Sequence, residues 1–226
     1  MIGLKPILLL AVLLGTPVAS FAQSDMGRWG EHRVFKEKLD EQDKKTDGNA
    51  AKLSPKQQIV NDFAACVWRQ APEKARIALG TAIDTKEERD ALVAISKYEA
   101  CSDVAFISGR SGEFRGALAE TGIHAAQDRS DRVRALSPVP AIRVAAAKGR
   151  TFVANYSSCI ASSDPIGSLA LLGTPLGSPE ETGAIQAMAA SLTGCMPEGA
   201  QYRVDVRDVR NHIADALYRM SELPNA

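Results

Sequence analysis

Aromatic residues and net charge are both scarce in this chain. Phe, Trp and Tyr make up 5% of its 226 residues, and 27 basic side chains balance 27 acidic ones. A chain without net charge offers no electrostatic basis for binding nucleic acid or an anionic membrane, so neither is expected as a partner. Few aromatic residues, abundant alanine and little strand-like alternation favour helices over a β-sandwich. The sequence therefore predicts an all-α fold.

The motifs of well-known catalytic sites are also missing. The chain has no HExxH, no P-loop, no GxSxG and no SxxK. The turn GRSG at 109–112 resembles a nucleophile turn only faintly, and the spacing of the three histidines does not indicate a metal site. We therefore expect no catalytic residue, no cofactor and no metal, with an enzyme kept only as the alternative to a binding protein.

A long apolar run occurs only near the N-terminus. PILLLAVLLGTPVA follows Lys5, and SFA at 20–22 supplies the small residues that a signal peptidase recognises. Residues 1–22 are expected to be a signal peptide cleaved after Ala22, with an uncleaved anchor as the alternative. No other run approaches the roughly 20 apolar residues of a transmembrane helix. We expect an exported protein without a transmembrane segment in its mature chain, periplasmic in a Gram-negative bacterium and otherwise secreted.

The order of residues around the four cysteines occurs twice. At an offset of 93 residues the chain matches itself at Cys66 and Cys159, at LGT 79–81 and LGT 172–174, and at Glu87–Glu88 and Glu180–Glu181. One inserted residue later Cys101 matches Cys195, and after a second insertion 114–120 matches 209–215. A shared order of this length predicts one supersecondary unit used twice. We expect a polar flexible arm at 23–52, unit one at 53–124, a connection at 125–140 and unit two at 141–226.

Each unit should contain three to four helices. The first helix has an apolar face that includes the first cysteine, as in Ile59, Phe63, Cys66 and Val67. Capping boxes then mark the start of a third helix, Thr85 with Glu88 in unit one and Ser178 with Glu181 in unit two. A pair of catalytic carboxylates would look similar locally, but the caps already explain these glutamates. The second cysteine of each unit is expected on the core face of that third helix.

The four cysteines fit two disulfides, one in each unit. An even number of cysteines in an exported protein indicates disulfide bonds. Pairing Cys66 with Cys101 and Cys159 with Cys195 is the simplest solution, because each unit then closes on itself. Each bridge would close a loop of about 36 residues and stabilise by about 3.5–4 kcal/mol. A zinc site of four thiolates is the rival interpretation, but it would need closely spaced CxxC pairs.

Arg115 and Arg210 occupy matching positions in the fourth helices. Such an arginine could bind the C-terminal carbonyls of a neighbouring helix, pair with the glutamate of a capping box, or line a groove for an anionic ligand. We favour the structural role, because a duplicated position implies a need intrinsic to the unit. His212, expected to form a surface pair with Asp208, completes the set of residues at a possible groove between the units.

These observations predict an architecture more firmly than a function. We expect a non-enzymatic exported binding or interaction module whose partner is an unidentified protein or small ligand. The alternative is an envelope enzyme or enzyme inhibitor with its site at the interface of the two units. A third possibility is a structural partner in an envelope assembly, with residues 23–52 folding on contact.

Overall fold

The computed structural model describes residues 55–104, 111–136, 151–198 and 206–223. Within these ranges every regular element is helical and no strand occurs. The predicted all-α class is therefore confirmed for the described residues. The expected signal peptide and polar arm lie outside them, as do residues 137–140 of the expected connection.

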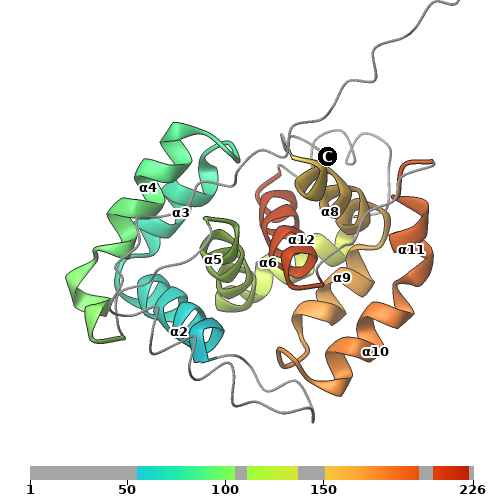
Figure 1. Ribbon diagram of the computed structural model, residues 1–226, viewed down its shortest axis with the longest axis horizontal. Helices are drawn as coiled ribbons and strands as arrows, with labels where there is room; N and C mark the ends of the chain where they lie inside the picture. Colours follow the sequence, from blue (N-terminus) through green and yellow to red (C-terminus); the bar gives the residue numbers. More distant parts are fainter. Residues whose placement is uncertain (1–54, 105–110, 137–150, 199–205, 224–226) are drawn as a thin grey trace, which may run out of the picture.

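Two helices form the centre of the molecule, and the others lie on either side of them. We call residues 55–136 the N-terminal half; its elements are α2 (Pro55–Gln70), α3 (Pro72–Gly80), α4 (Lys86–Ser96), the 3-10 helix η1 (Glu99–Val104), α5 (Ser111–Ala125) and α6 (Gln127–Ala135). Residues 151–223 are the C-terminal half, with α8 (Phe152–Ser163), α9 (Pro165–Leu172), α10 (Pro179–Ala187), α11 (Ala189–Gly194) and α12 (Val206–Ser221). Helices α5 and α12 pack side by side, with α2–α4 beyond α5 and α8–α11 beyond α12 (Figure 1).

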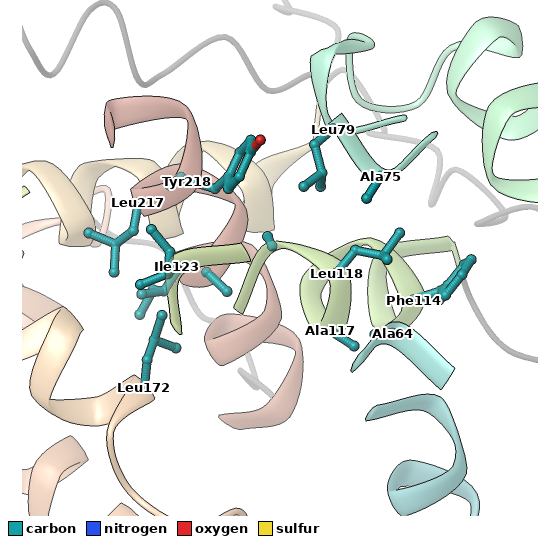
Figure 2. Close-up of a cluster of buried hydrophobic side chains, with 14 of the residues drawn as sticks. Ala64, Ala75, Leu79, Phe114, Ala117, Leu118, Ile123, Leu172, Leu217 and Tyr218 are labelled. Atoms are coloured by element: carbon teal, nitrogen blue, oxygen red, sulfur yellow. The ribbon is translucent and has the colours of Figure 1, made fainter. Parts of the chain in front are cut away.

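The two central helices approach so closely that one position requires glycine. A Cβ atom at Gly116 of α5 would lie 2.4 Å from the Cβ of Asn211 on α12. That distance is far inside van der Waals contact, so any side chain at Gly116 would push the helices apart. One buried apolar core runs through both halves. Figure 2 shows how α5 contributes to it on both sides: Phe114, Ala117 and Leu118 lie near Ala64, Ala75 and Leu79, while Ile123 lies near Leu172 and Leu217.

Both predicted disulfides are present. Cys66 is bonded to Cys101 and Cys159 to Cys195, with Cα atoms 5.8 and 5.7 Å apart. All four sulfurs are used in these bonds, so the rival zinc interpretation is wrong. Each disulfide joins two elements of the same half.

Cys66 and Cys159 lie on the first helix of each half, as predicted, but Cys101 and Cys195 do not lie on a third helix as expected. Helix α4 ends at Ser96, and Cys101 lies on η1, which packs against α2 and so places the sulfur beside Cys66. In the C-terminal half the expected third helix is interrupted at Met188, which ends α10 and precedes α11. Cys195 is the residue that caps the C-terminus of α11.

A helix also occupies part of the expected connection. Residues 127–135 form α6, although this stretch is mostly polar. Two of its side chains anchor it: Val133 is fully buried, and the Arg129 guanidinium lies 5.4 Å from the ring centroid of Trp68 and 5.1 Å from that of Tyr218. Arg129 also donates to the Gly122 carbonyl. This helix was not predicted from the sequence, because its anchor is an arginine that lies between two aromatic rings from distant parts of the chain.

The predicted capping boxes are present, with one shift. Thr85 Oγ1 accepts a hydrogen bond from Glu88 N at 3.2 Å, but the Glu88 carboxylate accepts from Asp84 N, one residue before the cap. Asp84 has a positive φ of 61°, which turns its N–H toward α4. The same arrangement occurs at α10: Ser178 Oγ accepts from Glu181 N, and the Glu181 carboxylate accepts from the N–H of Gly177, whose φ is 69°.

Candidate functional site

Arg115 lies at the centre of a buried polar cluster on α5. Its side chain is 2% exposed. Nε donates to Asp215 Oδ1 on α12 at 2.7 Å, and Nη1 lies 3.3 Å from Glu88 Oε1 at the start of α4. The remaining donors go to the C-terminal end of α3: Nη1 to Ala78 O and Thr81 Oγ1, and Nη2 to Leu79 O and Thr81 O. This guanidinium therefore holds α3, α4, α5 and α12 together.

Arg210 on α12 makes the corresponding set of bonds in the C-terminal half. Its side chain is 1% exposed, and its Nη1 lies 2.7 Å from Glu181 Oε1 at the start of α10. Nε and Nη2 form a bidentate pair with Glu120 on α5, at 3.2 and 2.7 Å. The other partners are at the end of α9: Thr174 Oγ1, Leu172 O and Thr174 O.

The two clusters exchange carboxylates across the central helix pair. Arg115 of α5 binds Asp215 of α12, and Arg210 of α12 binds Glu120 of α5. Every guanidinium nitrogen of both arginines already has a partner within the protein. The two structural contacts considered as alternatives for these arginines, with helix-end carbonyls and with the capping-box glutamate, therefore occur together.

Burial and ion pairing act against each other in these clusters. Burial raises the pKa of Glu88, and this effect outweighs the lowering by the nearby Arg115 charge. Burial also disfavours the charged form of Arg210, but its hydrogen bonds and ion pairs with Glu120 and Glu181 raise the pKa of Arg210 above its usual value. Arg210 is thus a permanent cation that is held between Glu120 and Glu181.

His212 lies beside these clusters and is buried. It is 9% exposed, so the expected surface position is wrong, although the charge of Asp208 still acts on the imidazole. α12 packs against α5, and a Cβ atom at Gly112 of α5 would lie 3.6 Å from the imidazole Nε2. Burial lowers the pKa of His212, while the negative charges of Asp215, Asp208 and Asp84 partly oppose that shift. The imidazole is therefore biased toward its neutral form.

The sequence analysis placed Arg115, Arg210 and His212 at a possible groove between the units. In the structure all three lie where α12 meets the N-terminal half, with their side chains packed among helices. The ionisable groups gathered there are largely paired with one another. A cavity exists, but none of the three residues lines it.

The cavity lies within the C-terminal half, between α8, α9, α10, α11 and α12. Its volume is about 130 Å³, and it is lined by Tyr156, Leu171, Ile185, Met188, Leu192, Val209 and Ile213. Every lining residue except Tyr156 has a purely apolar side chain. Met188 enters the cavity from the break between α10 and α11, so the interruption of the helix shapes the wall.

Tyr156 brings the one hydroxyl group to this wall, and that group is already bonded. Its Oη donates to the carbonyl of Leu192 on α11 at 2.9 Å, which ties α8 to α11 across one end of the cavity. The ring stacks on Phe152, with centroids 5.7 Å apart and planes 11° apart. Burial raises the pKa of Tyr156, so the phenol stays neutral. The site can bind apolar surface, and it offers no charged group for catalysis.

Ile185, Met188 and Leu192 recur at apolar helical spacing along the expected third helix, and Val209 and Ile213 along the expected fourth. Their apolar spacing predicts burial, but spacing does not reveal whether the buried side chains fill the space between them. One signal was present: the alignment of 114–120 with 209–215 sets Val209 against Phe114, a much larger side chain. In the N-terminal half Phe114 packs on Phe63 at a centroid distance of 5.6 Å.

In the parts of the chain that the structure describes, no helix is both long and apolar enough to cross a bilayer. Over the same ranges, no cluster of three or more His, Cys, Asp or Glu side chains is arranged to hold a metal ion. No known family model, curated protein or solved structure matches this chain.

Proposed function

We propose that this chain is an exported, non-enzymatic binding protein that holds a small ligand in the cavity of its C-terminal half. We also propose that its two halves are tandem copies of one helical unit, of which only the second has kept or gained the cavity. The observation that carries the binding proposal is the cavity itself, about 130 Å³ in volume and lined by seven residues without a charge among them.

The two arginine clusters support the tandem origin. Arg115 and Arg210 bind helix-end carbonyls, a threonine and a capping-box glutamate at positions that the sequence alignment pairs. Independent helices would have no reason to share this set of partners. The exchange of Asp215 and Glu120 across α5 and α12 is the contact that a symmetric pair of units would make.

The disulfides support export. Such bonds persist in oxidising compartments and are rare in the cytosol. Two of them in a helical protein with many alanines fit a mature chain that functions outside the cytosol. N-terminal sequencing of the protein from its producing organism should therefore begin at Gln23.

The chemistry of the buried groups favours binding over catalysis. A catalytic site needs ionisable groups that face substrate, with pKa values adjusted to the reaction. The two strongest polar clusters have arginines whose nitrogens already bind protein atoms. The cavity has an apolar wall with one hydroxyl that is already bonded.

Native mass spectrometry of the protein purified from its producing organism tests the proposal. We expect a population heavier than the mature chain by the mass of one small organic molecule, which dissociates on unfolding. A chain mass without any bound molecule, under conditions that preserve non-covalent complexes, would contradict a binding role.

A further inference from the structure

We infer that the cavity selects an uncharged apolar molecule about the size of a single aromatic ring. This inference rests on the proposed binding function and specifies the class of its ligand. It depends on three features of the wall: the volume it encloses, its polarity, and the identity of residue 209.

The volume limits the ligand to a few heavy atoms. Engineered apolar cavities of about 150 Å³ in other proteins remain dry and take up benzene. The cavity here, at about 130 Å³, is of the same order. A monocyclic or short branched hydrocarbon fits this space, whereas a long acyl chain or a nucleotide does not.

The polarity of the wall excludes charged ligands. Aliphatic side chains and the Met188 thioether form most of the wall, and the Tyr156 hydroxyl already donates to Leu192 O. A carboxylate or ammonium group placed there would lose its hydration without gaining a partner. Water also binds poorly in such a space, because a buried water needs two to four polar partners.

The cavity opens on the side of α10 and α11. The partly exposed side chains of its wall are Ile185 and Leu192, whereas the other five lining residues are buried. A ligand would therefore enter between α10 and α11, next to the break at Met188.

Residue 209 decides how much space remains. Val209 lines the cavity one residue before Arg210, and Phe114 occupies the place one residue before Arg115. The Phe114 ring lies against Phe63, and the sequence alignment pairs Phe63 with Tyr156. A phenylalanine at position 209 would place its own ring in the cavity. The smaller Val209 side chain leaves that space for the ring of a ligand.

Binding of toluene to the mature, disulfide-bonded chain tests the inference. Methyl-group NMR spectra should show shifts concentrated on the cavity residues Leu171, Ile185, Met188, Leu192, Val209 and Ile213. Two further probes define the class: benzoate has the same ring with a charge, and dodecanol is too long for the cavity. We expect saturable binding of toluene and at least tenfold weaker binding of the other two.

Val209→Phe should reduce toluene affinity at least tenfold while the chain remains folded. Ile166→Phe is the matched control, because Ile166 is 56% exposed on α9 and does not line the cavity; it should bind toluene like wild type. If Val209→Phe does not fold, Val209→Leu should fill less of the cavity and reduce toluene affinity by a correspondingly smaller factor.

The outcomes separate the ligand class from the binding function. Toluene binding that Val209→Phe abolishes and Ile166→Phe preserves supports the inference. Binding of benzoate or dodecanol in preference to toluene, still dependent on Val209, overturns the ligand class and leaves the binding function intact. If none of the three probes binds in a manner that depends on Val209, the inference is overturned, and native mass spectrometry then decides the broader proposal separately.

Discussion

The Arg115 and Arg210 clusters use the same kinds of bond but differ in their access to water. The carboxylates of Glu88 and Asp215 around Arg115 are 4% and 1% exposed. Those of Glu181 and Glu120 around Arg210 are 8% and 18% exposed. The same network is therefore closed to solvent on one side of the central helix pair and partly open on the other. Since an unpaired charge costs most where water cannot reach it, the two clusters should respond differently to the same substitution.

The apolar interiors of the two halves also differ, and again it is the C-terminal half that is less closed. Phe114 and Phe63 pack ring against ring in the N-terminal half, whereas Val209 and Tyr156 line a cavity in the C-terminal half. The long α4 of the N-terminal half also contrasts with the short α10 and α11, which Met188 separates. A ring thus fills the core of the N-terminal half at Phe114, whereas a cavity remains beside Val209 in the C-terminal half, where we propose that the ligand binds.

Removing the arginines should give the largest decrease in the free energy of unfolding. It is the most direct test of whether the two clusters differ because of their access to water. Arg115→Met would leave Glu88 buried without its cation and Asp215 with only the partly exposed Arg219, whose Nη2 lies 2.8 Å from Asp215 Oδ2. Breaking a buried pair in this way costs about 3–5 kcal/mol. Arg210→Met should cost less, near the lower end of that range, because water can reach Glu120. Urea denaturation of the oxidised proteins measures both values.

Arg69→Met is the control for removal of a positive charge, because Arg69 is exposed at the end of α2. Its effect should stay within about 0.5 kcal/mol. Equal losses for Arg115→Met and Arg210→Met would show that solvent access does not distinguish the clusters. A loss no larger than that of Arg69→Met would show that the clusters do not stabilise the fold.

The sequence predicted these clusters better than it predicted the cavity. Polar networks require particular residue types at particular positions, so Arg115, Glu88 and their counterparts could be recognised from a repeated pattern. Glu120 and Asp215 also occupy matching positions of the repeat. Their ion pairs with the arginines of the opposite half could not be recognised, because no pattern within one half specifies a contact with the other. They become visible only once α5 and α12 are side by side.

Apolar patterns are less specific than polar ones. The spacing of Ile185, Met188 and Leu192 predicts a buried face, but a filled core and a cavity have the same pattern. The break at Met188 has no proline or glycine at the break itself, so nothing in the sequence marks it. Helix α6 was missed for a similar reason, because its stabilising contact depends on Arg129 lying between two rings from other helices.

Loss of a disulfide should give the next largest decrease in the free energy of unfolding. The decrease should be the same for the two disulfides. The loops that they close have sequence separations of 35 and 36, so the chain-entropy model gives each about 3.5–4 kcal/mol. Replacing Cys66 and Cys101 by alanine should thus cost about as much as replacing Cys159 and Cys195. Thermal and urea unfolding of the two double variants check this.

A difference between the double variants would sharpen the contrast between the halves. Cys66 and Cys101 are buried, whereas Cys159 and Cys195 are partly exposed. If the first pair costs clearly more, packing of its sulfurs contributes beyond loop closure. If either variant unfolds like wild type, the corresponding bridge adds no stability.

The helix caps should give a smaller and nearly equal pair of effects. Thr85→Ala and Ser178→Ala each remove the side-chain oxygen that accepts a hydrogen bond from the backbone N–H three residues later, that of Glu88 or Glu181. Losing such a cap costs about 1 kcal/mol. Ser178→Ala should also loosen α10 and therefore weaken toluene binding, whereas Thr85→Ala should not. Unfolding curves and toluene titrations of both variants test the two statements together, and equal effects on binding would contradict the placement of the site.

The smallest effect concerns His212 and depends on pH. Because burial lowers its pKa below the usual 6.5, the folded protein holds this proton less tightly than the unfolded chain. His212 therefore favours folding fully above about pH 6.5, and this contribution is lost as the pH falls from there through the folded-state pKa. Glu88, with its raised pKa, acts with the opposite sign: its burial costs stability as the pH rises through the carboxylate range.

His212→Gln should consequently lose less stability than wild type between about pH 8 and pH 5.5. Glu88, Asp84, Asp208, Asp215 and Arg115 remain in both proteins, so their contributions largely cancel in the comparison. The same measurement on His124→Gln removes an exposed histidine at the end of α5, whose Nε2 lies 3.1 Å from Leu172 O, and so compares the loss of an exposed imidazole with the loss of a buried one. Parallel pH dependence of wild type and His212→Gln would show that the imidazole takes up its proton in the folded chain without cost, and α12 would then have to move away from Gly112 to let water reach it.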